Sequence, residues 1–239
     1  MTTAALPARF PSSGAVAPWW HTSIVVAFFL FMAAGGAVLQ HRAPTGAAFA
    51  AGSRPNLSWL YASMTAAEFG LVAFVYKSGL RRSGTSVSDL VGGSWRSPKA
   101  AITDLVLAGA TWMLWTGIAR LLEALLGGSS GASVSPLLPR TMQELVLWVV
   151  LSISAGFAEE VVFRGYLQRQ LTAYTGRVPL AVLLQVSVFA LAHGYQGAHN
   201  CFVIGVYGVL FTSLALWRKS LRPGILAHAW TDIASGLLG

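Results

Sequence analysis

Among the ionisable residues inside apolar stretches of this chain, six lie at spacings that suit proton transfer. They are Glu159, Glu160, Arg164, His193, His228 and Asp232. Ionisable side chains within membrane-length apolar segments are costly, and they usually face the interior of a helix bundle or a water-filled cavity. Carboxylates and imidazoles can take a proton from water and return it to a leaving group. These residue types are sufficient for peptide hydrolysis without a serine or cysteine nucleophile.

The first of these stretches is AGFAEEVVFRGYLQRQ, residues 155–170. Glu160 and Arg164 are four residues apart and share one face of a helix, so we expect them to form an ion pair. Glu159 lies about 100° further round a helix of 3.6 residues per turn, and it stays free for proton chemistry. The alternative is that both acids are interfacial and cap the inner end of their helix.

Two later stretches carry histidines at the same spacing. In FALAH, residues 189–193, Phe189 lies one helical turn before His193 and can fix the orientation of its imidazole. In LAHAWTD, residues 226–232, Asp232 follows His228 by one turn and can orient it or contact a substrate. Helix capping, or a histidine satisfied within the core, is the alternative. Because three apolar spans carry such pairs, we expect the pairs to converge on one cavity.

The composition indicates what kind of molecule positions these groups. The chain has 239 residues, of which 55% are hydrophobic and only 10% are charged, whereas a soluble domain carries about 25% charged residues. Apolar runs of the length that crosses a hydrocarbon core recur along it. They lie near residues 22–40, 57–77, 101–126, 142–163, 179–197, 200–217 and 222–238. The sequence therefore predicts an all-α fold, a polytopic transmembrane bundle of about seven or eight spans.

The basic residues predict how this bundle sits in a membrane. With the N-terminus cytoplasmic, ten Lys and Arg residues fall in inner loops and three in outer loops, as the positive-inside rule requires. The inner ones are Lys77, Arg81, Arg82, Arg96, Lys99, Arg169, Arg177, Arg218, Lys219 and Arg222, and the outer ones are Arg42, Arg54 and Arg140. This distribution accounts for the net charge of +8 without a nucleic-acid partner. The one cysteine, Cys201, excludes a disulfide within the chain.

The domain organisation follows from these spans. We expect a flexible lead over residues 1–20 and a helical bundle over residues 21–239, with the motifs in a core at residues 142–236. One mismatch remains within this arrangement. Glu159 lies near the inner third of its predicted span, whereas His193 lies 14 residues beyond Pro179, or roughly 21 Å along a helix. Only a tilted helix, or one that starts within the bundle, would bring the two to the same depth.

In chain order, EEVVFRG, FALAH and HAWTD resemble the motifs EExxxR, FxxxH and HxxxN or HxxxD of the CPBP intramembrane proteases. That family comprises the type II CAAX prenyl endopeptidases and the bacterial Abi-type proteins. The resemblance covers about residues 142–236. It implies an intramembrane endopeptidase, in a bacterial plasma membrane, that cleaves a membrane-associated peptide or protein at the cytoplasmic side of the lipid bilayer.

The resemblance also implies a role for each matching residue. Glu159 would activate water as general base together with His193, and Glu160 with Arg164 would support the site. Glutamate and histidine are competent zinc ligands, which makes zinc the candidate cofactor of a metalloprotease. Its ligands would be Glu159, His193 and His228. The chain has no HExxH motif, which favours metal-independent chemistry.

The final motif departs from the pattern of many family members. The resemblance implies that His228 and Asp232 stabilise an oxyanion or hold the scissile carbonyl, but many members have asparagine at the position of Asp232. An ionised carboxylate accepts hydrogen bonds and donates none. Asp232 is therefore either protonated, or its role is to orient His228.

Two other classes of function stay open. A membrane immunity factor or scaffold could keep these polar groups as a non-catalytic core. A proton-coupled transporter could use Glu and His as a relay, although the chain shows no clear inverted repeat with broken helices.

Overall fold

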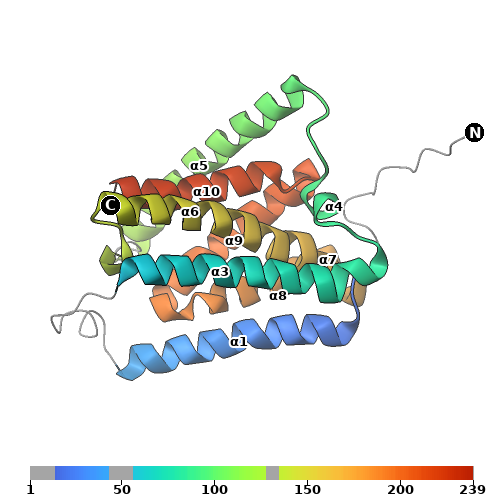
Figure 1. The fold of residues 1–239 in the computed structure, drawn as a ribbon, viewed down its shortest axis with the longest axis horizontal. Helices are drawn as coiled ribbons and strands as arrows, with labels where there is room; N and C mark the ends of the chain where they lie inside the picture. Colours follow the sequence, from blue (N-terminus) through green and yellow to red (C-terminus); the bar gives the residue numbers. More distant parts are fainter. Residues whose placement is uncertain (1–13, 43–55, 128–134, 239) are drawn as a thin grey trace, which may run out of the picture.

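The computed structural model describes residues 14–42, 56–127 and 135–238, which form the helical bundle of Figure 1. No strand occurs in these three ranges, so the predicted all-α fold is confirmed for them. Seven helices lie where apolar spans were predicted. They are α1 (Trp19–Arg42), α3 (Leu57–Phe74), α5 (Pro98–Leu126), α6 (Met142–Glu159), α8 (Val178–Ala192), α9 (Ala198–Arg218) and α10 (Arg222–Leu238).

The lengths and compositions of these helices make the chain an integral membrane protein. Four continuous helical segments are long and apolar enough to cross a membrane: Leu57–Ser83, Pro98–Leu126, Met142–Thr175 and Ala198–Arg218. Two shorter apolar helices, Trp19–Gly35 and Val178–Ala192, accompany them. In Figure 1, α10 ends at the opposite end of the bundle from the start of α1.

Local sequence signals explain where several helices begin. The side chain of Asn56 accepts a hydrogen bond from the backbone N–H of Trp59 at the start of α3. Thr141 and Glu144 form a reciprocal capping box at the start of α6. Such caps satisfy backbone N–H groups that the first turn of a helix leaves without partners.

The fourth predicted span is longer than its apolar run. Residues 142–163 were predicted, but the helix continues through the π-helical segment η4 (Glu160–Leu167) and α7 (Gln168–Thr175). Gly176, with φ of 64°, then ends it. The extension is polar in sequence, yet Gln168, Arg169 and Gln170 are buried. Tertiary packing therefore keeps this segment helical where hydropathy alone predicted a loop.

This longer helix removes the mismatch in depth between Glu159 and His193. Glu159 lies 16 residues before Thr175, and His193 lies 15 residues after Val178 at the start of α8. At a rise of 1.5 Å per residue, both are about 22–24 Å from the same turn. The mismatch arose because the predicted span ended near residue 163, whereas the helix continues to Thr175.

The segment before α1 is held against α7. Residues 1–13 of the predicted flexible lead lie outside the described part of the chain. Val16 and Ala17 are buried, and their backbone N–H groups donate to Oε1 of Gln170 at 2.6 and 3.1 Å. Helix α1 already begins at Trp19.

Helices α6 and α10 lie side by side and carry the glutamate and histidine motifs (Figure 1). Their close approach depends on Gly156, where a Cβ atom would lie 2.6 Å from the backbone nitrogen of Ala229. Small residues allow membrane helices to pack at such short range.

We expect Gly156→Ala to destabilise the protein by about 1–3 kcal/mol, since the added methyl group meets backbone that cannot move aside. A lower melting temperature of the purified protein in detergent would show it. Gly109→Ala is the matched control, because a Cβ at Gly109 on α5 meets no atom within 4 Å. Equal melting temperatures for the two variants would contradict this close packing.

Candidate active site

A cavity of about 360 Å³ lies inside the bundle, among α3, α5, α6, α8, α9 and α10. Four of the six predicted site residues line it: Glu159, His193, His228 and Asp232. The structure thus brings together side chains from α6, the end of α8 and α10, as the repeated spacing predicted. Glu160 and Arg164 are fully buried beside the cavity, outside its lining.

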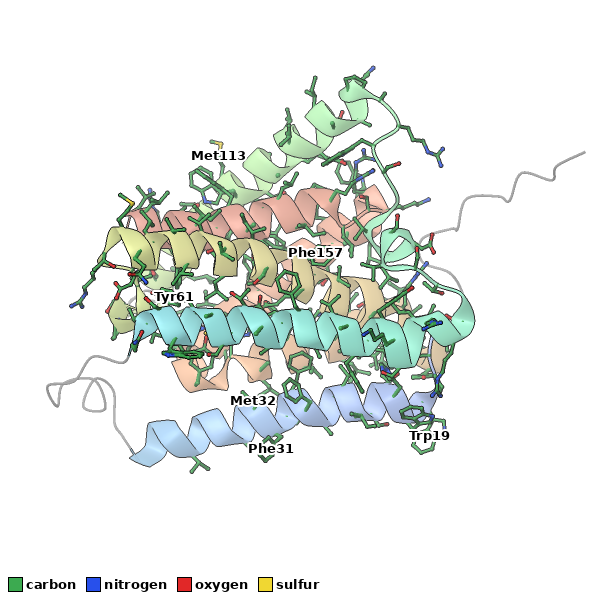
Figure 2. The ribbon with its side chains drawn as sticks, viewed as in Figure 1. Trp19, Phe31, Met32, Tyr61, Met113 and Phe157 are labelled. Carbon is green, nitrogen blue, oxygen red and sulfur yellow. The ribbon has the colours of Figure 1, made fainter. Side chains whose placement is uncertain are left out.

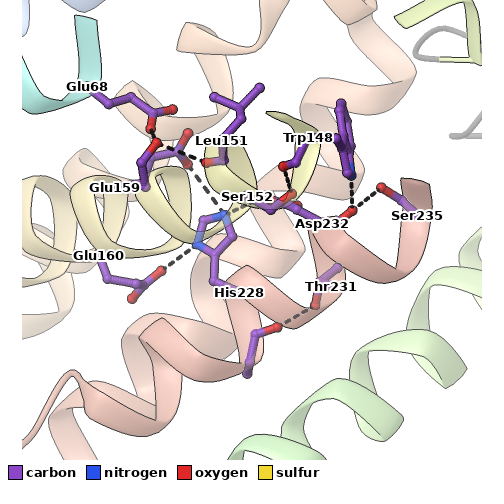
Figure 3. A network of polar contacts seen from close by, with 12 residues as sticks. Glu68, Trp148, Leu151, Ser152, Glu159, Glu160, His228, Thr231, Asp232 and Ser235 are labelled. Carbon is purple, nitrogen blue, oxygen red and sulfur yellow. Dashed lines mark hydrogen bonds and ion pairs between the residues drawn. The ribbon is translucent and has the colours of Figure 1, made fainter. Parts of the chain in front are cut away.

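His228 is the centre of the polar network in Figure 3. Its Nδ1 lies 3.1 Å from Oε1 of Glu160, within hydrogen-bond distance. Its Nε2 lies 3.7 Å from Oε2 of Glu159 and 3.7 Å from Oδ2 of Asp232. Because a carboxylate can only accept, Nδ1 is the donor to Glu160. Glu160, and not Asp232, therefore makes the direct hydrogen bond that orients this imidazole.

The predicted ion pair holds Glu160 in place. Nη1 of Arg164 lies 3.1 Å from Oε1 of Glu160, and both side chains are completely buried. The guanidinium also lies over the ring of Phe189, 4.2 Å from its centroid. The pair forms within the π-helical segment η4. A chain of contacts thus runs from Phe189 on α8 through Arg164 and Glu160 to His228 on α10.

His193 ends α8 with non-helical backbone angles, φ of −95° and ψ of 15°. Its Nδ1 donates to the backbone carbonyl of Phe189 at 2.9 Å, and the two rings meet edge to face with centroids 4.9 Å apart. The sequence pointed only to the ring contact. The hydrogen bond to the carbonyl fixes the tautomer of His193 with its proton on Nδ1. Nε2 is then the ring nitrogen that can accept a proton.

The structure adds a third carboxylate to this cavity. Glu68 on α3 lines the cavity and accepts a hydrogen bond from the hydroxyl of Ser154 (Figure 3). An ionisable side chain inside an apolar span usually faces the interior of a helix bundle, and this is the sequence signal for the position of Glu68. Trp148 is a further contact that the motifs did not indicate, since its indole N–H donates to the backbone carbonyl of Asp232 at 2.8 Å and ties α6 to α10.

The proposed zinc ligands do not form a metal site. Among the residues that the structure describes, no group of three or more His, Cys, Asp and Glu side chains is arranged to hold a metal ion. The set Glu159, His193 and His228 therefore does not fit zinc, and the interpretation as a metalloprotease is not supported. Cys201 does not line the cavity.

The cavity extends from Glu159 toward one end of the bundle. From Glu159 it reaches Tyr61 near the start of α3, Trp148 in the first half of α6 and Ser235 near the end of α10. These ends lie opposite the start of α1 in Figure 1, and Figure 2 shows Tyr61 at the opposite end of the bundle from Trp19, where α1 begins. If the N-terminus is cytoplasmic, these helix ends face the outer side of the membrane. A cavity that reaches the outer side does not suit cleavage at the cytoplasmic side, so these two expectations are not compatible.

In the part of the chain that the structure describes, the protein is thus an all-helical membrane protein in which carboxylates and imidazoles line one cavity. Residues 141–234 match the family model described as type II CAAX prenyl endopeptidase Rce1-like, and this segment is a domain of that family. The matched range contains all six predicted site residues and confirms the resemblance drawn from the three motifs. No curated protein and no solved structure matches the chain.

Proposed function

We propose that this protein is an intramembrane endopeptidase of seven or eight spans that hydrolyses a peptide bond of a membrane-associated peptide or protein. The observation that carries the proposal is the convergence of Glu159, His193, His228 and Asp232 from three separate segments on one cavity. A family that cleaves peptides in membranes supplies the reaction class. A cytoplasmic N-terminus is part of the proposal.

The first step is the attack of water on the scissile carbonyl. Glu159 has one carboxylate oxygen, Oε2, that is buried without a hydrogen-bond partner among the described residues, and its side chain is 24% exposed to the cavity. It takes a proton as the water oxygen bonds to the carbonyl carbon, and the π electrons of the carbonyl move to its oxygen. His193, with Nε2 free to accept, positions the same water.

The second step breaks the peptide bond. The electron pair returns from the oxyanion, the C–N bond breaks, and the proton held by Glu159 passes to the leaving nitrogen. The products are a carboxylic acid and an amine, and Glu159 is again a carboxylate. No covalent intermediate with the protein is needed, which agrees with the place of Cys201 outside the cavity lining.

His228 and Asp232 complete the site around the scissile carbonyl. The buried Glu160–Arg164 pair holds Nδ1 of His228, and this leaves Nε2 as the nitrogen that faces Glu159 and Asp232. Asp232, 3.7 Å from Nε2 of His228, acts through this imidazole and supports the orientation that the direct hydrogen bond to Glu160 sets.

The test is to map new protein termini in membranes of cells that produce the natural chain or its Glu159→Gln variant. We expect a set of cleaved termini with the natural chain only, and the uncleaved proteins to co-purify with the variant. Cleaved termini that persist with a well-folded Glu159→Gln variant would contradict proteolysis. Uptake driven by a pH gradient in liposomes, with no new termini, would identify a transporter instead.

A further inference from the structure

Tyr207 on α9 has a buried hydroxyl group that the fold does not satisfy. The residue lines the cavity and is only 6% exposed. Its hydroxyl oxygen is buried and has no hydrogen-bond partner among the residues that the structure describes. An unpaired buried hydroxyl is costly, and most buried polar groups have partners. A phenylalanine at this position would avoid the cost, so the hydroxyl calls for an explanation.

The ring of Tyr207 is held rigidly against the catalytic groups. It stacks on Phe211 with centroids 4.0 Å apart, and it meets Trp115 edge to face at 4.9 Å. The imidazole of His228 meets it edge to face at 5.2 Å. The side chain is therefore fixed beside His228, although it belongs to none of the three motifs.

The reaction needs hydrogen-bond donors at the carbonyl oxygen. Attack on the carbonyl leaves negative charge on that oxygen, and fixed donors near it are usually the largest single contribution to catalysis. Asp232 as a carboxylate accepts hydrogen bonds and donates none, whereas the phenol of Tyr207 can donate one.

We propose that Tyr207 is a further catalytic residue, which donates a hydrogen bond from its phenol to the carbonyl oxygen as that oxygen becomes an oxyanion. The inference rests on the proposed peptidase function and names the donor at that same site. A hydroxyl without a partner in the resting protein gains one when charge develops on the substrate. Such an interaction, made mainly in the transition state, raises turnover more than substrate affinity.

Tyr207→Phe is the test, with a fluorogenic peptide that carries a cleavage site found by the termini mapping. We expect kcat to fall about 10²–10³-fold, with little change in KM. The melting temperature should stay the same or rise, because the variant removes a buried hydroxyl without a partner. A purely structural Tyr207 would give a kcat within twofold of the natural protein, and that result would overturn the proposal.

Tyr61→Phe is the matched control. Tyr61 also lines the cavity, but its hydroxyl already donates to the backbone carbonyl of Leu137, so we expect its kcat to stay within a few-fold of the natural value. An equal loss of kcat in both variants would overturn the role of Tyr207. Glu159→Gln separates the two proposals. Loss of turnover in Glu159→Gln but not in Tyr207→Phe removes only the donor, and full turnover in both removes the donor and the assignment of Glu159 as the base. A purified natural protein that does not cleave the peptide would remove the peptidase function itself.

Discussion

Glu159→Gln should lower the turnover of the cleaved peptide by about 10²–10⁴-fold, the usual contribution of a general base. Glutamine keeps the size of the side chain but cannot accept the proton of the attacking water. The protein should remain folded, because the nearest ionic contact of Glu159 is the one 3.7 Å from Nε2 of His228. Turnover of the fluorogenic peptide and the melting temperature in detergent would be measured together.

Glu144→Gln is the control for this change on the same helix. Glu144 lies in the capping box at the start of α6, where glutamine is as suitable as glutamate, so turnover and stability should both be retained. If Glu159→Gln keeps more than a tenth of the natural turnover, another group takes the proton and the assignment of Glu159 as the base is wrong.

Arg164→Met should have the largest effect on stability of any single change in the site. It leaves Glu160 as a buried carboxylate without its 3.1 Å partner, and removal of one member of a buried ion pair typically costs about 3–5 kcal/mol. Methionine retains an apolar contact with Phe189, so the loss reports mainly on the charge. Denaturation of the purified protein in detergent would measure it, and turnover should fall as well, because Glu160 no longer holds His228 firmly.

The double variant Glu160→Gln/Arg164→Met separates stability from catalysis. With the lone buried charge removed, most of the lost stability should return, since an apolar or neutral replacement of a buried pair is often close to neutral. Turnover should stay low, because the neutral amide oxygen is a weaker acceptor for Nδ1 of His228 than the carboxylate is. A single variant that loses less than about 1 kcal/mol would show that Glu160 and Arg164 are not paired as described.

The positions of the helices were largely predictable from the sequence. Apolar run length depends on the thickness of a bilayer, and helix hydrogen bonds join residues only four apart, so both can be recognised in short windows. For the same reason the spacing of Glu160 and Arg164 was enough to predict their ion pair, and the spacing of Phe189 and His193 to predict their ring contact. The order of the three motifs was enough to predict the family of residues 141–234.

Contacts between helices were beyond the reach of such local patterns. The sequence could not show that Glu160 orients His228 across 68 positions of the chain, or that the fourth helix continues to Thr175 through buried polar residues. Tyr207, whose hydroxyl has no hydrogen-bond partner among the described residues, belongs to none of the three motifs. Local periodicity in the sequence determined which groups share a helix face. Only the packing of α6, α8, α9 and α10 decided which of these faces meet, because burial and hydrogen bonding between distant segments depend on the whole fold.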